Sequence, residues 1–149
     1  MSSYHEQFYL DAPVSSVWRL VGDPRRHVEW WPQAVEVRGE RFEEGDEYIQ
    51  VSCAPLGMRQ TTRHEVQRLD DLHEIRLICQ KTGRYAQWVL TEARGGTFVE
   101  AEMGLEPRAF GYKLFERTAG KYYLRRWLDQ AVDGLRAAAS TDRPAPPAD

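Results

Sequence analysis

His64 is the residue whose type and position best suit chemistry. It lies two residues before Val66 in the stretch RQTTRHEV, so an alternating strand phased by Val66 places both side chains on the buried face. An imidazole titrates near neutral pH, which suits a general base. Two alternatives remain open: a histidine hydrogen-bonded within the core, and a strand shifted by one residue that buries Arg63 and Glu65 instead.

The other reactive side chains show no spacing that binds a metal or activates a nucleophile. Metal ligands normally stand at short, regular intervals. The sequence also lacks a glycine-rich phosphate loop and a G-x-S-x-G motif. We therefore predict no metal site and no cofactor. The residues considered are His5, His27, His64, His73, Cys53 and Cys79.

Aromatic side chains are the main candidates for contacts with a ligand, and the chain has five tryptophans and seven tyrosines. Trp30 and Trp31 precede Pro32 directly, and adjacent side chains do not share a face of a helix or strand. One of them therefore packs in the core while the other points elsewhere. Trp88 and Trp127 fall on elements expected to face each other, so we predict that they line a pocket. Core packing is the alternative explanation for most of these rings.

Size and charge restrict the class of protein. The 149 residues carry a net charge of −3, which argues against nucleic acid or an anionic membrane as the main partner. No apolar run approaches the roughly 18 residues of a membrane span. The start, MSSYHEQFYL, has no signal-peptide pattern, so we expect a cytoplasmic monomer or homodimer. Cys53 and Cys79 stand in apolar or alternating stretches and are expected to be buried, free thiols.

The hydrophobic periodicity changes once along the chain. A strand is expected at 4–10, with Asp11 as the cap of a short helix at 14–22. Asp23 and Pro24 begin a second short helix that ends at Trp30 or Trp31. Period-two segments separated by turn residues then predict six strands, and a long amphipathic helix covers 118–139. The strands are expected within 34–40, 46–53, 59–69, 73–81, 84–93 and 97–106.

Each strand has one parity that is mostly apolar, and we predict that this parity faces inward. The opposite parity is mostly Glu, Arg and Gln. The inward set is Val35, Val37, Ile49, Val51, Cys53, Thr62, His64, Val66, Ile75, Leu77, Cys79, Ala86, Trp88, Leu90, Val99, Ala101, Met103 and Leu105.

Short connections between consecutive strands predict an antiparallel meander. Its apolar face needs a cover, and the terminal helix is the only element long enough to provide it. The fold class is therefore α+β, with a curved seven-stranded sheet around one helix and space for a ligand between them. We expect one domain at 1–139 and a disordered, proline-rich tail at 140–149.

Three stretches resemble one family. They are FYLDAPVSSVWRLVGDPRRHVEWWP, WVLTEARGGTFVEAEMGLE and LRRWLDQAVDGLRAAA. Together they look like the polyketide cyclase/dehydrase-like branch of the START-like (SRPBCC) superfamily, over about residues 4–139. The resemblance implies a helix-grip fold around a deep, mostly apolar cavity. Relatives bind lipids, sterols, plant hormones and aromatic polyketides, and some cyclise or hydrolyse their ligands.

The resemblance also suggests roles for individual residues. A tryptophan before Pro32 is common where it plugs one end of the sheet, so Trp31 is expected to be structural and Trp30 to lie at the mouth or surface. Phe110–Phe115 matches a segment that covers the entrance in relatives. Aromatic polyketide cyclases use a strand-borne Arg and Tyr to orient the polyketone, and Arg63 and Tyr85 are the candidates here. Predicted ligand-binding residues are Trp30, Trp31, Val51, Cys53, His64, Leu77, Trp88, Met103, Phe110, Phe115, Tyr123 and Trp127.

Three functions follow from this sequence. The first is binding of a small, largely apolar ligand such as a lipid, polyketide or aromatic metabolite. The second is a polyketide cyclase or aromatase, with His64, Arg63 and Tyr85 as catalytic candidates. The third is a protein-interaction module that uses Trp30 and the 110–115 segment as its surface.

Overall fold

The chain forms a curved sheet, two short N-terminal helices and one long C-terminal helix. The computed structural model describes residues 3–53, 57–106 and 121–141. Its elements are β1 (Ser3–Leu10), α1 (Val14–Val21), the 3-10 helix η1 (Pro24–Glu29), β2 (Ala34–Arg38), β3 (Glu47–Cys53), β4 (Arg59–Asp70), β5 (Glu74–Cys79), β6 (Arg84–Ala93), β7 (Gly96–Leu105) and α3 (Lys121–Thr141).

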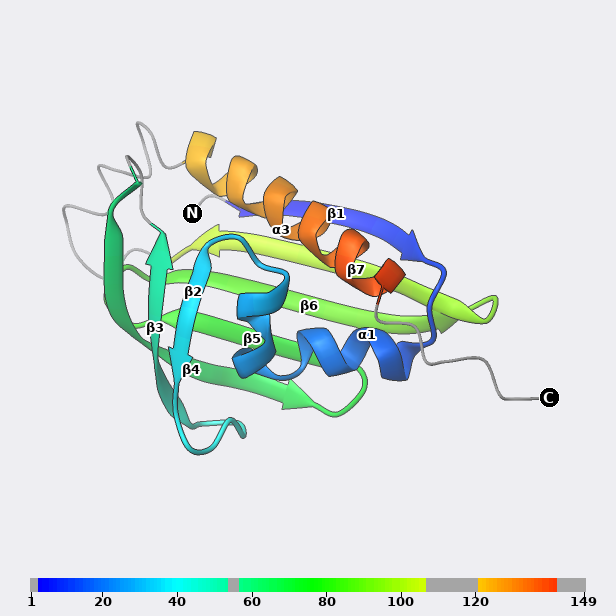
Figure 1. Ribbon diagram of the computed structural model, residues 1–149, viewed down its shortest axis with the longest axis horizontal. Coiled ribbons are helices and arrows are strands. Elements are labelled where there is room, and N and C mark those ends of the chain that lie inside the picture. The colour runs from blue at the N-terminus through cyan, green and yellow to red at the C-terminus, as the bar shows by residue number, and fades with distance from the viewer. Residues whose placement is uncertain (1–2, 54–56, 107–120, 142–149) are drawn as a thin grey trace.

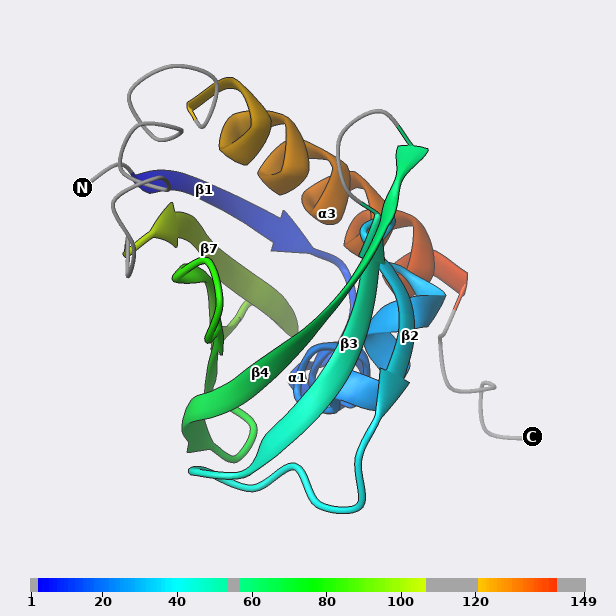
Figure 2. The ribbon, with the colours of Figure 1, turned by 90° about the vertical axis from the view of Figure 1, so that its left-hand side faces the viewer.

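The seven strands form one antiparallel sheet in the order β1-β7-β6-β5-β4-β3-β2. The predicted meander is confirmed, and β1 adds to its far edge by pairing with β7. The sheet bends strongly, and α3 crosses its concave side (Figures 1 and 2). α3 packs against β1, β7 and α1. This is the predicted helix-grip architecture.

Local sequence signals explain the two short helices. α1 ends at Gly22, whose backbone N–H donates to the Trp18 carbonyl. η1 begins at Asp23, whose side chain accepts from the backbone N–H of Arg25, and Pro24 opens its first turn as expected. The cap predicted for α1 is wrong: Pro13 holds the N-cap position and no side chain caps this helix.

The predicted inward parity is confirmed on four strands. Val66, Ile75, Trp88 and Val99 are at most 1% exposed in the core of β4, β5, β6 and β7. They belong to the same core cluster as the buried face of α3, which presents Leu124, Leu128, Ala131, Val132, Leu135 and Ala139. Burial of this apolar area is the main stabilising contribution to the fold.

The parity of β3 is opposite to the prediction. Tyr48, Gln50 and Ser52 are buried, whereas Val51 is half-buried and Cys53 is exposed. The register explains the difference, because Tyr48 pairs directly with His64 of β4 and directly paired side chains share a face. An apolar pattern alone gave the wrong phase because the inward residues of this strand are polar or amphipathic.

The C-terminal helix continues two residues beyond its expected end. It spans Lys121–Thr141, whereas the sequence predicted 118–139, so it extends past the expected domain boundary, and 118–120 lie outside the described residues. The end of the predicted tail, 142–149, lies outside the described residues. No helix in the described part of the chain is long and apolar enough to cross a membrane.

Candidate functional site

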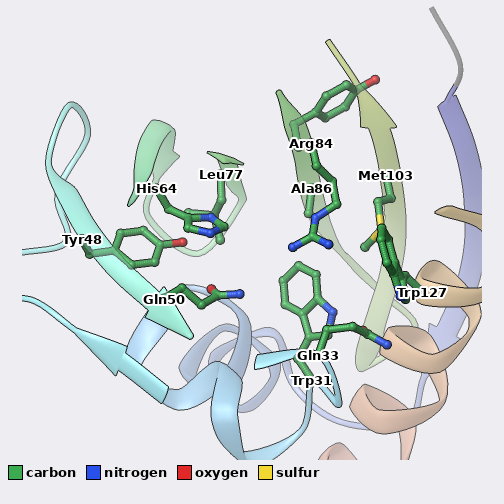
Figure 3. A pocket seen from close by; sticks show the side chains of 11 residues that line it. Trp31, Gln33, Tyr48, Gln50, His64, Leu77, Arg84, Ala86, Met103 and Trp127 are labelled. Carbon is green, nitrogen blue, oxygen red and sulfur yellow. The ribbon is translucent and has the colours of Figure 1, made fainter. Parts of the chain in front are cut away.

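A cavity lies between the concave face of the sheet and the start of α3 (Figure 3). The cavity proper measures about 20 Å³, within about 390 Å³ of unfilled space that includes its opening to solvent. At rest it therefore has room for about one water molecule, and a larger ligand requires lining side chains to move. Its described lining residues are Trp31, Gln33, Tyr48, Gln50, His64, Leu77, Arg84, Tyr85, Ala86, Met103 and Trp127.

Three polar side chains from β3 and β4 form one wall of this cavity. The rings of Tyr48 and His64 stack with centroids 5.4 Å apart. His64 Nε2 shares a hydrogen bond of 2.9 Å with Thr62 Oγ1, and Gln50 donates to Ser52 Oγ at 2.8 Å. The Tyr48 hydroxyl is buried and has no hydrogen-bond partner among the described residues. The wall is therefore polar, where the sequence predicted an apolar surface with few polar groups.

Burial keeps both rings of this wall neutral. Burial, the nearby Arg84 charge and His27 lower the pKa of His64 to about 3. Burial raises the pKa of the Tyr48 phenol well above its ordinary value. Neither group exchanges a proton near pH 7, so His64 is a neutral hydrogen-bonding residue in the resting protein. The lowered pKa makes His64 a weak base, and its role as a general base stays a prediction.

Arg84 faces this wall from the start of β6 (Figure 3). Its guanidinium carbon lies 4.6 Å from the centroid of the Trp127 ring. Burial lowers the pKa of Arg84, while Cys79 and Tyr48 raise it. An arginine still keeps its proton in proteins. The cavity therefore contains a positive charge.

The turn before Arg84 fixes the start of β6. Gly83 has a φ of +78°, and a Cβ there would overlap the carbonyl oxygen of Glu106. Only glycine fits this close approach without strain. The Gly83 N–H donates to the Cys79 carbonyl at 2.8 Å, and Arg84 N donates to Thr82 Oγ1 at 3.1 Å. These contacts fix the backbone at the start of β6, from which the half-buried Arg84 side chain reaches the cavity.

Trp31 and Gln33 close the cavity from the segment between η1 and β2. Trp31 stacks on Trp30 with centroids 5.6 Å apart, and both rings meet Trp88 edge-on. Gln33 donates to the side chain of Gln130 on α3. The indole N–H of Trp31 and the Oε1 of Gln33 are buried without a partner among the described residues.

The two adjacent tryptophans have the roles opposite to those predicted. Trp30 is 4% exposed and donates its indole N–H to the Leu20 carbonyl at 2.9 Å, so it is the structural residue. Trp31 lines the cavity. Burial of Trp30 also removes the exposed ring on which the interaction-module hypothesis relied.

The predicted catalytic arginine and tyrosine do not converge with His64. Arg63 lies on the exposed face of β4 and pairs with Glu47, Nη1 to Oε2, at 3.0 Å. Tyr85 borders the cavity, but its hydroxyl donates to Glu102 at 2.7 Å and Arg76 lies over its ring. Burial and Glu102 raise the pKa of Tyr85 to about 12.

The other predicted ligand-binding residues divide into four groups. Leu77, Met103 and Trp127 line the cavity together with His64 and Trp31. Trp88 is buried in the core, and Tyr123 is half-buried on α3 beside Trp127, so neither is among the lining residues. Val51 and Cys53 belong to the outward parity of β3. Phe110 and Phe115 lie outside the described residues.

Four lining residues were missed by sequence reasoning. Arg84 has the parity of Ala86 and Trp88, so the alternation already pointed inward. Tyr48 and Gln50 were missed because their strand was phased by its apolar residues. Gln33 had no signal, because it lies in a loop. Among the described residues, no group of three or more His, Cys, Asp or Glu side chains is placed to hold a metal ion.

The fold, with a cavity between its sheet and α3, defines a START-like helix-grip protein. A family model described as polyketide cyclase/dehydrase and lipid transport matches residues 1–140. The chain belongs to that family. A search of curated proteins found no match.

Solved structures of low sequence identity share the fold. A crystal structure of a protein from Thermus thermophilus has a TM-score of 0.71 at 17% identity, covering 94% of this chain and 98% of that one. A protein from Mesorhizobium loti gives 0.70 at 13% identity, with coverage of 94% and 98%. An AHSA1-like protein from Aeromonas hydrophila gives 0.64 at 14% identity, with coverage of 94% and 93%.

Proposed function

We propose that the protein binds a small amphipathic organic molecule in the cavity between the sheet and α3. The observation that carries this proposal is a set of unpaired hydrogen-bonding groups around one cavity: the Tyr48 hydroxyl, the Trp31 N–H and the Gln33 Oε1. A buried polar group without a partner costs about 1–3 kcal/mol. A ligand that supplies partners recovers this free energy.

The lining also suggests how such a ligand lies. Leu77, Met103 and Trp127 offer apolar surface, whereas Tyr48 and Arg84 offer polar groups. This division suits a lipid, polyketide or aromatic metabolite with a polar end better than a purely apolar one. The family description, which includes lipid transport, supports binding as the activity. We place the protein in the cytoplasm, where Cys53 and Cys79 stay reduced.

Ligand binding requires the narrow cavity to widen. Trp127 is half-buried on α3, and its described ring contacts are Arg84 and Tyr123. Rotation of this side chain about χ1 is the change that we expect to open the cavity to a ring or an acyl chain. Rotamer changes of this kind are common when proteins bind ligands or partners.

Native mass spectrometry of the purified protein, with solvent extraction, tests the proposal first. A discrete added mass, or a saturable change in tryptophan fluorescence with a panel of aromatic and fatty acids, is the expected result. Ala86→Leu adds volume to the cavity wall and should weaken binding at least tenfold. Val89→Leu is the matched control, because Val89 has the opposite parity on the same strand. Equal binding by wild type and Ala86→Leu would exclude this cavity as the site.

A cyclase or dehydrase that uses the same cavity is the second candidate. It is favoured by the shared exposure of Tyr48 and Arg84 to one space, which suits orientation of a polar substrate. It requires a proton-transfer group, and the pKa of His64, lowered to about 3, makes its neutral ring a weak base. Turnover that is lost in Tyr48→Phe while ligand binding persists would support an enzyme.

A further inference from the structure

Arg84 differs from the other cavity residues in carrying a charge that no carboxylate of the described chain meets. Other arginines pair with acids: Arg76 Nη2 lies 2.9 Å from Glu106 Oε1, and Arg38 Nε lies 2.9 Å from Glu36 Oε1. Among the described residues, the Arg84 guanidinium forms no ion pair with a carboxylate. It lies over the Trp127 ring in a cation–π contact. Arg84 is half-buried, and partial desolvation of a cation without a counter-ion is unfavourable.

The groups opposite Arg84 are hydrogen-bond donors as well. Tyr48 and Gln50 point into the same space from β3, and Trp31 lies beneath the guanidinium (Figure 3). The Tyr48 hydroxyl and the Trp31 N–H are unpaired. The Gln50 amide is already engaged with Ser52. Two free donors beside one cation form a site that suits an acceptor-rich anion.

The surrounding rings restrict the rest of the ligand. Trp31 and Trp127 both line the cavity, and Met103 completes an apolar side (Figure 3). The cavity proper has little free volume, which disfavours a bulky group. Aromatic side chains bind flat rings by stacking or edge-to-face contact.

On these grounds we infer that the ligand is a planar aromatic carboxylate, with its carboxylate bound by Arg84 and Tyr48 and its ring against Trp31 and Trp127. This inference rests on the proposed function and names its ligand class. The carboxylate accepts from the guanidinium and from the phenol. Binding draws Arg84 away from the Trp127 ring and frees that ring to contact the ligand.

An internal counter-ion is the competing explanation. Cys79 is buried near Arg84. Its burial raises the pKa of the thiol, but hydrogen bonds with Thr82 and Thr62 lower it by more. A Cys79 thiolate would neutralise Arg84 without any ligand. The test must therefore separate a ligand carboxylate from this thiolate.

The experiment compares 2-naphthoate with its neutral amide, 2-naphthamide, by fluorescence titration and calorimetry on the full chain. We expect 2-naphthoate to bind at least tenfold more tightly. Arg84→Gln should remove that preference while leaving 2-naphthamide binding within about twofold. Arg63→Gln, on the exposed face of β4, should change neither affinity.

Each other outcome overturns the inference in a different way. Equal affinity of the two probes for wild type would refute the anionic ligand and leave the proposed function standing. Binding of neither probe, with no native ligand recovered, would refute both. Thiolate absorbance at 240 nm at pH 7 that disappears in Cys79→Ser would identify the internal counter-ion. The probe comparison needs no variant, so it decides the question even if Arg84→Gln does not fold.

Discussion

Trp30 and Trp31 are adjacent in sequence, yet the fold uses them differently. Trp30 donates to the Leu20 carbonyl and packs in the core, whereas the Trp31 N–H is unpaired at the cavity. Burial and hydrogen bonding both stabilise the Trp30 ring in its position. The second ring is only half-buried and is available to a ligand.

Alanine substitution separates these two roles. Trp30→Ala should lower the free energy of unfolding by about 3–5 kcal/mol, because it opens a core cavity. Trp31→Ala should cost less than half of that and should mainly weaken ligand binding. Urea denaturation followed by circular dichroism measures both values. Equal losses of stability would show that Trp31 is as structural as its neighbour.

The pH dependence of stability is a second residue-scale consequence. His64 keeps its neutral form in the fold until about pH 3, whereas an unfolded histidine titrates near 6.5. Between these values the unfolded chain binds more protons, so stability falls as pH decreases, by up to about 1.4 kcal/mol per pH unit for one histidine. Burial also lowers the pKa of His27, to about 4, so both rings act in the same direction.

His64→Gln should therefore reduce the loss of stability between pH 6.5 and 4. His5→Gln is the control, because His5 is exposed on β1. Denaturant midpoints at several pH values give the slope for each variant. An unchanged slope in His64→Gln would mean that this ring is protonated in the folded protein.

At the scale of elements, the phase of β3 decides the character of the cavity. Its register with β4 places Tyr48 opposite His64 and turns Cys53 outward. A shift by one residue would exchange the polar wall for Ile49 and Val51. The cavity would then be apolar, as the sequence pattern suggested.

Thiol reactivity tests this phase directly. Cys53 is exposed and Cys79 is 2% exposed, so a thiol reagent should label Cys53 at least tenfold faster in the native protein. Cys79 should react only as the chain opens or unfolds. Cys53→Ser and Cys79→Ser assign the two rates. Protection of both thiols would support the phase predicted from sequence.

The contact between α3 and the η1–β2 segment depends on one glycine. A Cβ at Gly134 would overlap the carbonyl oxygen of Trp30. Helix propensity alone predicts that Gly134→Ala stabilises the protein by about 1 kcal/mol. We expect a loss of about 1–3 kcal/mol instead, because the overlap separates packed elements.

Thermal and urea unfolding of Gly134→Ala measure this effect. Asp133→Ala, at the adjacent exposed position, should leave the free energy of unfolding within about 0.5 kcal/mol of wild type. Stabilisation by Gly134→Ala would show that the close approach of α3 to Trp30 does not exist in solution.

For the whole molecule, one core joins the sheet to α3. Leu135 is fully buried in the same cluster as Val66, Ile75 and Val99. A single core of this size normally unfolds in one cooperative transition. Helix and sheet should therefore lose structure together.

Leu135→Ala should lower the free energy of unfolding by about 2–5 kcal/mol. Transitions followed by far-ultraviolet circular dichroism and by tryptophan fluorescence should coincide in both wild type and variant. An early loss of helix signal with an intact fluorescence transition would show that α3 and the sheet unfold separately.

The sequence by itself determined the elements, their order and the face of most strands. Turn residues marked the connections, and apolar alternation fixed the phase wherever the inward residues were apolar, as in β5 and β7. The inward parity of Arg84 also followed from the sequence, because Arg84 alternates in step with Ala86 and Trp88.

Only the tertiary structure decided what the cavity is made of. Strand register brought Tyr48 beside His64, and close packing gave the stacked rings of Trp30 and Trp31 different environments. Local propensity does not encode these arrangements, because both depend on contacts between segments far apart in sequence. In a sequence, a polar residue at an inward position has the same pattern as a surface residue. Only the packing of the sheet against the helix shows which polar side chains line the cavity.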